Sequence, residues 1–188
     1  KYAFGVSDGT NAMIIGLRSL NVKPNDEIII ASHTYVATAA AVHLVGAKPV
    51  FADIGNDWLM SSKSAQSKIT GKTKVIMPTQ LNGRCCNMEE INSIAKKNGL
   101  YICEDSAQAL GAKFKNKCAG SFGSFGTFSF YPNKTITCGE GGMITTNSEK
   151  LAEKARDLKN LCYGKNNKFM HTGIGFQFRM SNVSAAMG

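Results

Sequence analysis

Short apolar runs alternate along this chain with stretches in which apolar residues recur every three or four positions. The runs predict buried strands, and they fall at residues 28–31, 49–52, 75–77 and 101–103. The periodic stretches predict helices, most clearly at Met88, Ile91 and Ala95 and again at Leu151, Ala155 and Leu158. This alternation predicts one α/β domain, in which a mostly parallel sheet is flanked by helices on both faces.

A lysine follows the aromatic strand predicted within FSFYPNKTITCGEGG, residues 128–142. Pro132 has no backbone N–H to donate, so we expect the strand to end at Tyr131 and the chain to leave the sheet as a loop. Lys134 then lies just past the end of a strand, where α/β folds gather their ligands. A lysine in such a partly desolvated crevice can lose its proton and attack a carbonyl. The alternative is a solvated loop lysine.

Two acids, Glu104 and Asp105, follow the strand predicted at the start of YICEDSAQALGA, residues 101–112. If the pleat continues, they point to opposite faces, so one of them can reach the same crevice. A carboxylate about 4 Å from a ring nitrogen, at an effective dielectric near 20, contributes about 4 kcal/mol. That is about three pKa units, enough to keep a pyridine nitrogen protonated at neutral pH. Lysine and acid together suggest pyridoxal phosphate, and the alternative for Asp105 is a loop or helix-capping acid.

A phosphate site is predicted in GVSDGTNAM, residues 5–13. Gly9 and Thr10 precede a helical pattern, so their amides would lie at a helix N-terminus, where anions bind. Ser129 is the expected second donor, because its strand leads into the Lys134 loop. Asp8 would repel a phosphate, so we expect its side chain to cap the helix and face away. Without the other two motifs, a plain capped helix would be the better interpretation.

The formal net charge of +9 raises the question of nucleic acid. The lysines are spread along the chain, without a tight run and without the interleaved aromatic residues of a nucleotide-stacking surface. We therefore predict no nucleic-acid partner. An anionic cofactor and a nucleotide diphosphate substrate are consistent with the sign of the charge, although they need only a few of these lysines.

The six cysteines have no CxxC spacing, and Cys85 and Cys86 are adjacent. We therefore expect reduced thiols and a cytoplasmic protein rather than a disulfide framework. His33, His43 and His171 lack the spacing of zinc ligands, so no metal site is predicted. No apolar run approaches the roughly 20 residues needed to cross a bilayer, so no membrane partner is predicted.

The chain resembles the DegT/DnrJ family of nucleotide-sugar aminotransferases from residue 6 to residue 188. The resemblance rests on VSDGTNA, DEIIIASHTYVATAAAV, GAKPVFADI, EDSAQALGA, GSFGSFGTFSFYPNKTITCGEGGMITTN and GFQFRMSNVSAAMG. It implies pyridoxal phosphate and the large domain of a fold type I transferase, an α/β/α sandwich. Because the chain starts at Lys1 and ends at Gly188 within a predicted helix, we expect a fragment that lacks an N-terminal helical stretch and a C-terminal small domain.

The resemblance also implies residue roles. Lys134 would form the Schiff base with the cofactor, Asp105 would pair with the pyridine nitrogen and Gln108 would contact the ring hydroxyl. Tyr35 matches the aromatic residue that stacks on the ring, unless it is a core tyrosine. Gly9, Thr10 and Ser129 match the phosphate binders. Gln177 replaces the family's usual Asn, which reaches the cofactor phosphate of the neighbouring subunit, so a homodimer with shared active sites is implied.

By the same resemblance, an amino group moves from L-glutamate to a nucleotide-linked 4-keto-6-deoxy sugar, for amino-sugar and surface polysaccharide biosynthesis. KTITCGEGG resembles the family members that aminate C4, and its glycines at 139, 141 and 142 are expected to let the backbone approach cofactor and sugar. The turn Gln80-Leu81-Asn82-Gly83 replaces an HLYG-type turn that faces the substrate. Amination at C3, a sugar dehydratase, which typically has histidine in place of Lys134, and a non-catalytic regulatory or anion-binding module remain alternatives.

Overall fold

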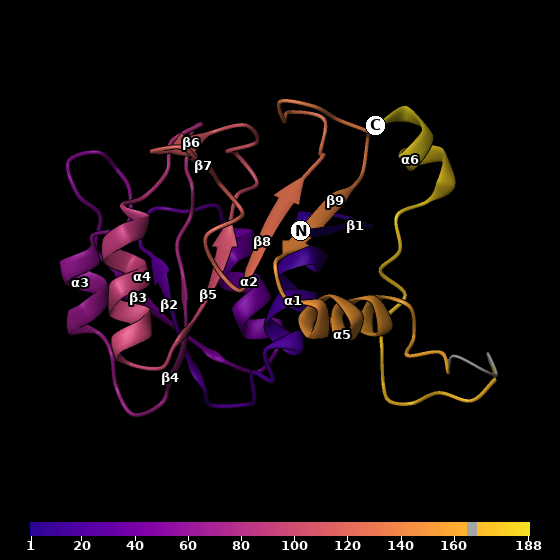
Figure 1. Ribbon diagram of the computed structural model, residues 1–188, viewed down its shortest axis with the longest axis horizontal. Coiled ribbons are helices and arrows are strands. Elements are labelled where there is room, and N and C mark those ends of the chain that lie inside the picture. Colours follow the sequence, from indigo (N-terminus) through magenta and orange to yellow (C-terminus); the bar gives the residue numbers. More distant parts are fainter. Residues whose placement is uncertain (165–168) are drawn as a thin grey trace.

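A computed structural model describes residues 1–164 and 169–188 of the protein, in which a seven-stranded sheet carries helices (Figure 1). The strands of this sheet are β1 (Tyr2–Val6), β2 (Glu27–Ala31), β3 (Lys48–Ala52), β4 (Thr73–Met77), β5 (Tyr101–Asp105), β8 (Phe125–Ser129) and β9 (Gly142–Thr146). A separate short hairpin consists of β6 (Lys113–Phe114) and β7 (Lys117–Cys118). The helices are α1 (Gly9–Ser19), α2 (Val36–Leu44), α3 (Ser62–Ser67), α4 (Met88–Lys97), α5 (Glu149–Lys159) and α6 (Asn182–Met187).

The strand order is β1-β9-β8-β5-β4-β2-β3. From β8 to β3 every neighbouring pair is parallel, whereas β9 runs antiparallel to both β8 and β1. The predicted mostly parallel sheet is therefore confirmed, as are the strands expected at β2, β3, β4 and β5 and the helices expected at α4 and α5. The antiparallel edge formed by β1 and β9 was not predicted.

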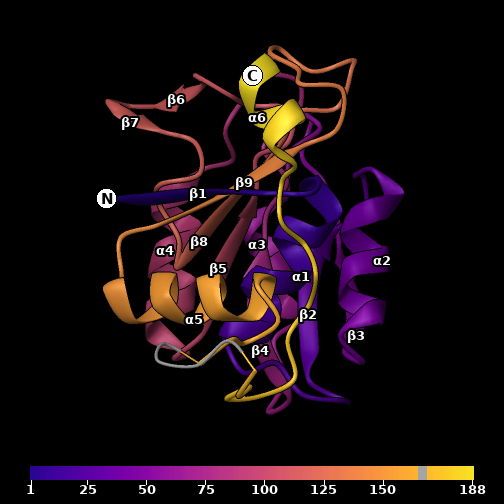
Figure 2. The ribbon, with the colours of Figure 1, turned by 90° about the vertical axis from the view of Figure 1, so that its right-hand side faces the viewer.

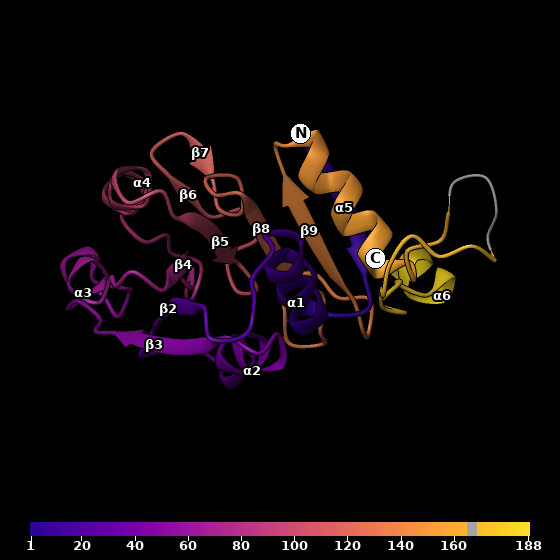
Figure 3. The ribbon, with the colours of Figure 1, turned by 90° about the horizontal axis from the view of Figure 1, so that it is seen from below.

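The sequence EIIIA of β2 shows why the sheet lies between two helical layers. Ile28 and Ile30 pack into a core with side chains of α1, α2 and α5. Ile29 and Ala31 pack into a second core with side chains of α3 and α4. Successive side chains of a strand point to opposite faces, so a strand that is apolar throughout needs cover on both sides. Figure 3 shows the helices divided between the two sides of the sheet.

The carboxyl ends of the parallel strands meet at one edge of the sheet, where ligand sites of α/β folds lie. The C-terminal segment runs up the side of the molecule past β1 and brings α6 close to the loop at Cys138 (Figure 2). It passes the end of β1, where the Ser7 amide donates to the Phe178 carbonyl at 3.0 Å. Within the described residues, no helix is long and apolar enough to cross a membrane.

Candidate active site

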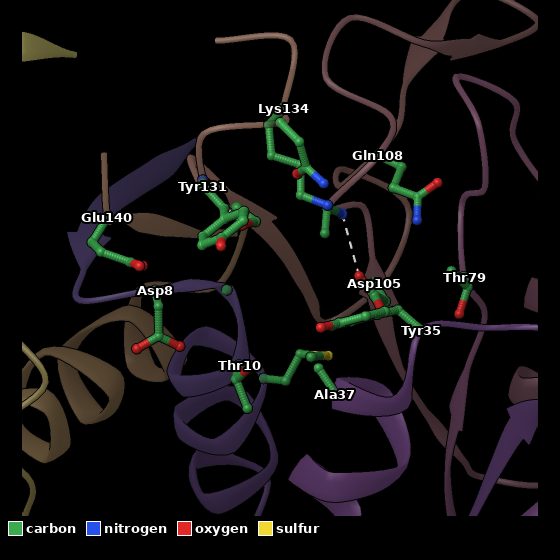
Figure 4. A pocket seen from close by; sticks show the side chains of 15 residues that line it. Asp8, Thr10, Tyr35, Ala37, Thr79, Asp105, Gln108, Tyr131, Lys134 and Glu140 are labelled. Atoms are coloured by element: carbon green, nitrogen blue, oxygen red, sulfur yellow. Dashed lines mark hydrogen bonds between the residues drawn. The ribbon is translucent and has the colours of Figure 1, made fainter. Parts of the chain in front are cut away.

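A cavity of about 380 Å³ opens at the carboxyl ends of β5 and β8, beside the N-terminus of α1 (Figure 4). Every residue predicted to bind the cofactor lines it, with the exception of Gln177. The predicted residues in its wall are Gly9, Thr10, Tyr35, Asp105, Gln108, Ser129 and Lys134. The wall is completed by Asp8, Met13, Ala37, Thr79, Ala107, Tyr131, Asn133 and Glu140.

Lys134 enters the cavity from a tight turn that follows β8. The Lys134 amide donates to the Tyr131 carbonyl at 3.0 Å, and Pro132 occupies the second position of this turn, where its fixed φ is favoured. The loop predicted after Pro132 is therefore confirmed. However, β8 already ends at Ser129, so the strand end predicted at Tyr131 was wrong. Figure 4 shows the side chains of Lys134 and Asp105 at the same cavity.

The last two residues of β5, Glu104 and Asp105, point to opposite faces of the sheet, as predicted from the pleat. Asp105 lines the cavity, whereas Glu104 is fully buried against other segments. The Glu104 carboxylate accepts a hydrogen bond from Nε2 of Gln80 at 3.0 Å and three more from backbone amides. Those amides belong to Gly120, Phe122 and Gly123, at 2.8, 2.7 and 2.8 Å. Glu104 thus fixes the loop before β8, and Asp105 is the acid that is available to a ligand.

Asp105 is 4% exposed, so its charge is poorly screened by water. Oδ2 accepts a hydrogen bond from Thr38 Oγ1 at 2.6 Å, and Oδ1 accepts one from the Ala107 amide at 3.2 Å. Burial raises the pKa of the Asp105 carboxyl, while these two hydrogen bonds and the charge of Lys134 lower it. A cationic ring nitrogen beside Asp105 would favour the ionised carboxylate further, so the site suits a buried positive group.

The N-terminus of α1 meets the end of β8 at the cavity. Asp8 caps the helix as predicted: its oxygens accept hydrogen bonds from the Asn11 amide at 2.8 Å and from the Asn11 side chain at 2.7 Å. Gly9 lies so close to Ser129 that a Cβ at position 9 would be 2.8 Å from Ser129 Cβ. The start of α1 thus lies against Ser129, and Thr10 lines the same cavity, an arrangement typical of a phosphate site.

Tyr35 and Gln108 flank the acid. Tyr35 occupies the N-cap position of α2 and is 68% exposed, so the alternative of a core tyrosine is wrong. Its ring is open to a ligand in the cavity. The side chain of Gln108 accepts a hydrogen bond from the Asn82 amide at 3.3 Å, and its carbonyl accepts one from the Gly83 amide at 2.8 Å. The turn at Asn82 and Gly83 thus holds Gln108 in place.

Gln80, the first residue of the turn that replaces the HLYG-type turn, does not line the cavity. Gln80 is fully buried, where its side chain bonds to Glu104 and accepts from the Cys86 amide at 2.7 Å. This turn therefore acts on the cavity indirectly, through Gln108.

The glycines of the KTITCGEGG segment also have a role in packing. A Cβ at Gly142 would collide with the backbone of Asp8, and one at Gly141 would collide with Cys138. These two glycines let the protein's own segments pack closely, and their approach to cofactor and sugar stays a prediction.

Gln177 lies outside the cavity. It is exposed, and its backbone forms an isolated bridge with Asn160. Its action on a neighbouring subunit stays a prediction.

Sequence reasoning missed Thr38 and Thr79. Thr79 comes just after β4, and Asp105 is the last residue of β5. The position of Thr79 after a predicted strand could therefore have identified it as a residue of the cavity. Thr38 lies in the first turn of α2, and nothing in the sequence distinguishes it from other helical threonines.

Comparison with known proteins gives a consistent result. A model of the DegT/DnrJ/EryC1/StrS aminotransferase family matches residues 1–188. GDP-perosamine synthase from Escherichia coli O157:H7 is 42% identical over 189 residues, which cover 100% of this chain and 52% of that protein. The chain spans about half the length of the curated relatives it matches.

Two solved structures share the fold. The aminotransferase from Psychrobacter cryohalolentis has a TM-score of 0.95 at 34% identity, and the match covers 100% of this chain and 50% of that chain. NtdA from Bacillus subtilis, solved with bound cofactor PMP, has a TM-score of 0.91 at 32% identity, with 100% of this chain and 43% of that chain covered.

Proposed function

The chain belongs to the DegT/DnrJ/EryC1/StrS aminotransferase family, and we propose that residues 1–188 form the cofactor-binding domain of a pyridoxal-phosphate-dependent nucleotide-sugar aminotransferase. The predicted α/β/α sandwich of the fold type I transferases is confirmed by the likeness to solved aminotransferases. One observation carries the proposal: Lys134, Asp105 and the N-terminus of α1 meet at one cavity.

The residues present fit pyridoxal phosphate. Its phosphate needs an anion site, which the start of α1 offers together with Ser129. Its ring nitrogen needs an acid, which Asp105 offers, and the hydrogen bond from Thr38 favours the ionised form of that acid. Its carbonyl needs an amine, which Lys134 offers. The exposed ring of Tyr35 provides a flat surface for the cofactor ring.

When bound, pyridoxal phosphate supplies a carbonyl that reacts reversibly with amines and a ring that accepts electrons. Lys134 would hold that carbonyl through its Nζ, and L-glutamate is the proposed amino donor. The free Lys134 amine would serve as base and acid for proton transfer at the α-carbon of the donor. Asp105 keeps the ring nitrogen protonated, because its charge acts at short range in a site that is nearly closed to water. Gln108 orients the ring.

The proposed acceptor is a nucleotide-linked 4-keto-6-deoxy sugar, and the proposed role is amino-sugar synthesis for surface polysaccharides. The KTITCGEGG segment, whose Lys134 and Glu140 line the cavity, supports amination at C4 through its resemblance to the family members that aminate C4. The name of the relative GDP-perosamine synthase agrees with a nucleotide-sugar substrate. A homodimer with shared active sites and a cytoplasmic location complete the proposal, the latter because all six cysteines are free thiols.

Cofactor attachment tests the proposal most directly. The full-length protein should be yellow, and borohydride reduction should fix the cofactor on the peptide that contains Lys134. Lys134→Ala should bind the cofactor without such fixation. Lys115→Ala is the matched control, since Lys115 lies on the surface in an ion pair with Glu89, and it should behave like the wild type. A label on another lysine, or no cofactor binding by the wild type, would refute the assignment.

Product analysis tests the reaction. We expect the full-length protein, given L-glutamate and a panel of UDP-, GDP- and dTDP-linked 4-keto-6-deoxy sugars, to convert at least one into a 4-amino sugar, located by NMR. Amination at C3 would overturn the C4 assignment and leave the aminotransferase class intact. Loss of a hydroxyl group without transfer of an amine would instead identify a dehydratase.

A further inference from the structure

Three threonine hydroxyl groups form a continuous hydrogen-bonded chain that ends on Asp105. Thr38 Oγ1 donates to Asp105 Oδ2 at 2.6 Å. Thr34 Oγ1 lies 2.7 Å from Thr38 Oγ1 and 2.8 Å from Thr79 Oγ1. The members come from three places: the loop after β2, the first turn of α2 and the end of β4. The chain therefore connects three neighbouring segments to the acid.

The chain is shielded from water over most of its length. Thr38 is fully buried, and both Thr79 and Asp105 are 4% exposed. Thr79 also lines the cavity, so the chain begins at the cavity wall and ends at the acid. Within a buried chain each hydroxyl group has one proton to donate and few water molecules to replace its partners. Its hydrogen bonds are therefore coupled to one another.

The protonation state of Asp105 sets the direction of these bonds. An ionised carboxylate only accepts, so Thr38 must donate to it. The Thr38 oxygen can then accept from Thr34, and the Thr34 oxygen from Thr79. All three protons point toward Asp105 in this arrangement, and each bond polarises the next. Protonation of the carboxylate would remove the charge that strengthens the bond from Thr38 and would leave the direction of the chain unfixed.

We propose that Thr38, Thr34 and Thr79 are positioning residues that fix the orientation of Asp105 and hold it as an ionised acceptor for a cationic ring nitrogen. This inference rests on the proposed function. None of the three threonines touches the reacting atoms. They act through Asp105, and Thr38 acts most strongly because it bonds to the carboxylate itself.

Other groups around Asp105 act on the same charge. Lys134 faces it from the loop after β8 and favours ionisation. Cys103, two residues earlier in β5, is a thiol whose pKa is raised by burial and by the charge of Asp105. Glu104 is bonded on the other side of the sheet. Among the described residues, the direct hydrogen bonds to the Asp105 carboxylate come from Thr38, the last member of the hydroxyl chain, and from the Ala107 amide.

The test compares Thr38→Val, which keeps the shape of the side chain and removes the hydroxyl group, with Thr38→Ser, which keeps the hydroxyl group. Binding of pyridoxal phosphate to the full-length protein is titrated spectroscopically from acid to neutral pH. A lost hydrogen bond to the ionised form raises the pKa of Asp105. For Thr38→Val we therefore expect binding that is about ten- to hundredfold weaker, and an acid limb of the binding profile moved up by about one pH unit.

Two further variants sharpen the test. Thr79→Val should shift the acid limb in the same direction by less, because it removes the far end of the chain. Thr70→Val is the matched control. Thr70 Oγ1 also donates to a carboxylate, Glu27 Oε2, at 2.6 Å, but Thr70 precedes β4 and Glu27 begins β2, so this pair lies at the end of the strands opposite to the cavity. It should leave the binding profile unchanged. If Thr38→Val fails to fold, the acid limb of the Thr79→Val binding profile tests the inference, and an unshifted limb would refute it.

Different failures have different meanings. If the wild type binds the cofactor and Thr38→Val keeps its affinity and acid limb, the inference is wrong and the proposed function stands. If Thr38→Ser loses binding as fully as Thr38→Val, the side chain matters for packing and the positioning role is wrong. If the wild type does not bind the cofactor, the proposed function itself is wrong, and the inference is wrong with it.

Discussion

At the scale of single residues, the site places groups in positions that are costly without a ligand. Asp105 is an acid in a nearly dry position. It accepts hydrogen bonds from Thr38 and Ala107, and within the described residues it forms no ion pair. Gly9 is pressed against Ser129, which leaves no room for a side chain. Such features are typical of sites kept for a ligand, and the proposed cofactor would place its ring nitrogen at Asp105 and its phosphate at Gly9.

Replacing Asp105 by Asn is expected to stabilise the cofactor-free protein. Burial raises the folded-state pKa of Asp105, so the stability linked to this group is present at acid pH and is lost as the pH rises through that pKa. At neutral pH, Asp105→Asn should therefore raise the free energy of unfolding by about 1 kcal/mol, as measured by urea denaturation. The gain should vanish below about pH 3.9. The same variant should lose transaminase activity, and an unchanged activity would contradict the role of Asp105.

A Cβ at position 9 should damage the anion site. Gly9→Ala would place a methyl group 2.8 Å from Ser129 Cβ, so α1 and β8 must separate. Overpacking of this kind costs about 1–3 kcal/mol, and we expect at least about tenfold weaker binding of pyridoxal phosphate in a spectroscopic titration. Gly71→Ala is the control, because no atom lies within 4 Å of its added Cβ. Equal affinities of the two variants would argue against a phosphate site here.

At the scale of elements, the sequence predicts what short-range patterns determine. The apolar run of β2 and the three-to-four spacing in α4 identify those elements because burial alone dictates them. Strand β1 was not predicted, because apolar and polar residues alternate only weakly in YAFGV. This strand pairs with β9, whose partner residues lie about 140 positions away in sequence. Such a pairing is a property of the folded chain. The hydroxyl chain was hidden for the same reason, since Thr34 and Thr79 meet only after β2 and β4 pair.

Replacement of Glu104 measures how much the hydrogen bonds of one side chain contribute to the free energy of unfolding. Its carboxylate accepts from Gln80 and from three backbone amides, so it links β5 to the turn after β4 and to the loop before β8. Glu104→Gln would aim an NH₂ group at these donors. We expect a loss of about 3 kcal/mol in the free energy of unfolding. Glu89→Gln, which breaks the exposed pair with Lys115, should cost less than about 1 kcal/mol. If both variants lose less than about 1 kcal/mol in the free energy of unfolding, the hydrogen bonds of Glu104 do not stabilise the fold.

At the scale of the whole molecule, the cavity could be predicted because its residues follow strands or begin a helix, positions that motifs mark in sequence. Gln177 marks the limit of that approach. It lies on an exposed segment that the described residues do not bring to the cavity. The family resemblance predicts that a second copy of the chain receives this side chain at its cavity, and this stays a prediction. Relations between two copies leave no periodic signal in one sequence.

Subunit mixing can test that prediction. In a symmetric dimer with shared sites, a full-length Lys134→Ala subunit and a Gln177→Ala subunit each carry one defect, and their heterodimer contains one site with both residues intact. If each variant alone has little activity, random exchange in equal amounts should restore about a quarter of wild-type activity, because half of the dimers are mixed and each has one competent site. Lys134→Ala mixed with Asp105→Asn is the control. Both defects lie at the same cavity, so no heterodimer has an intact site and no recovery is expected. No recovery in the test pair would place Gln177 outside the partner's site. Recovery in the control would mean that Lys134 and Asp105 do not act at the same cavity.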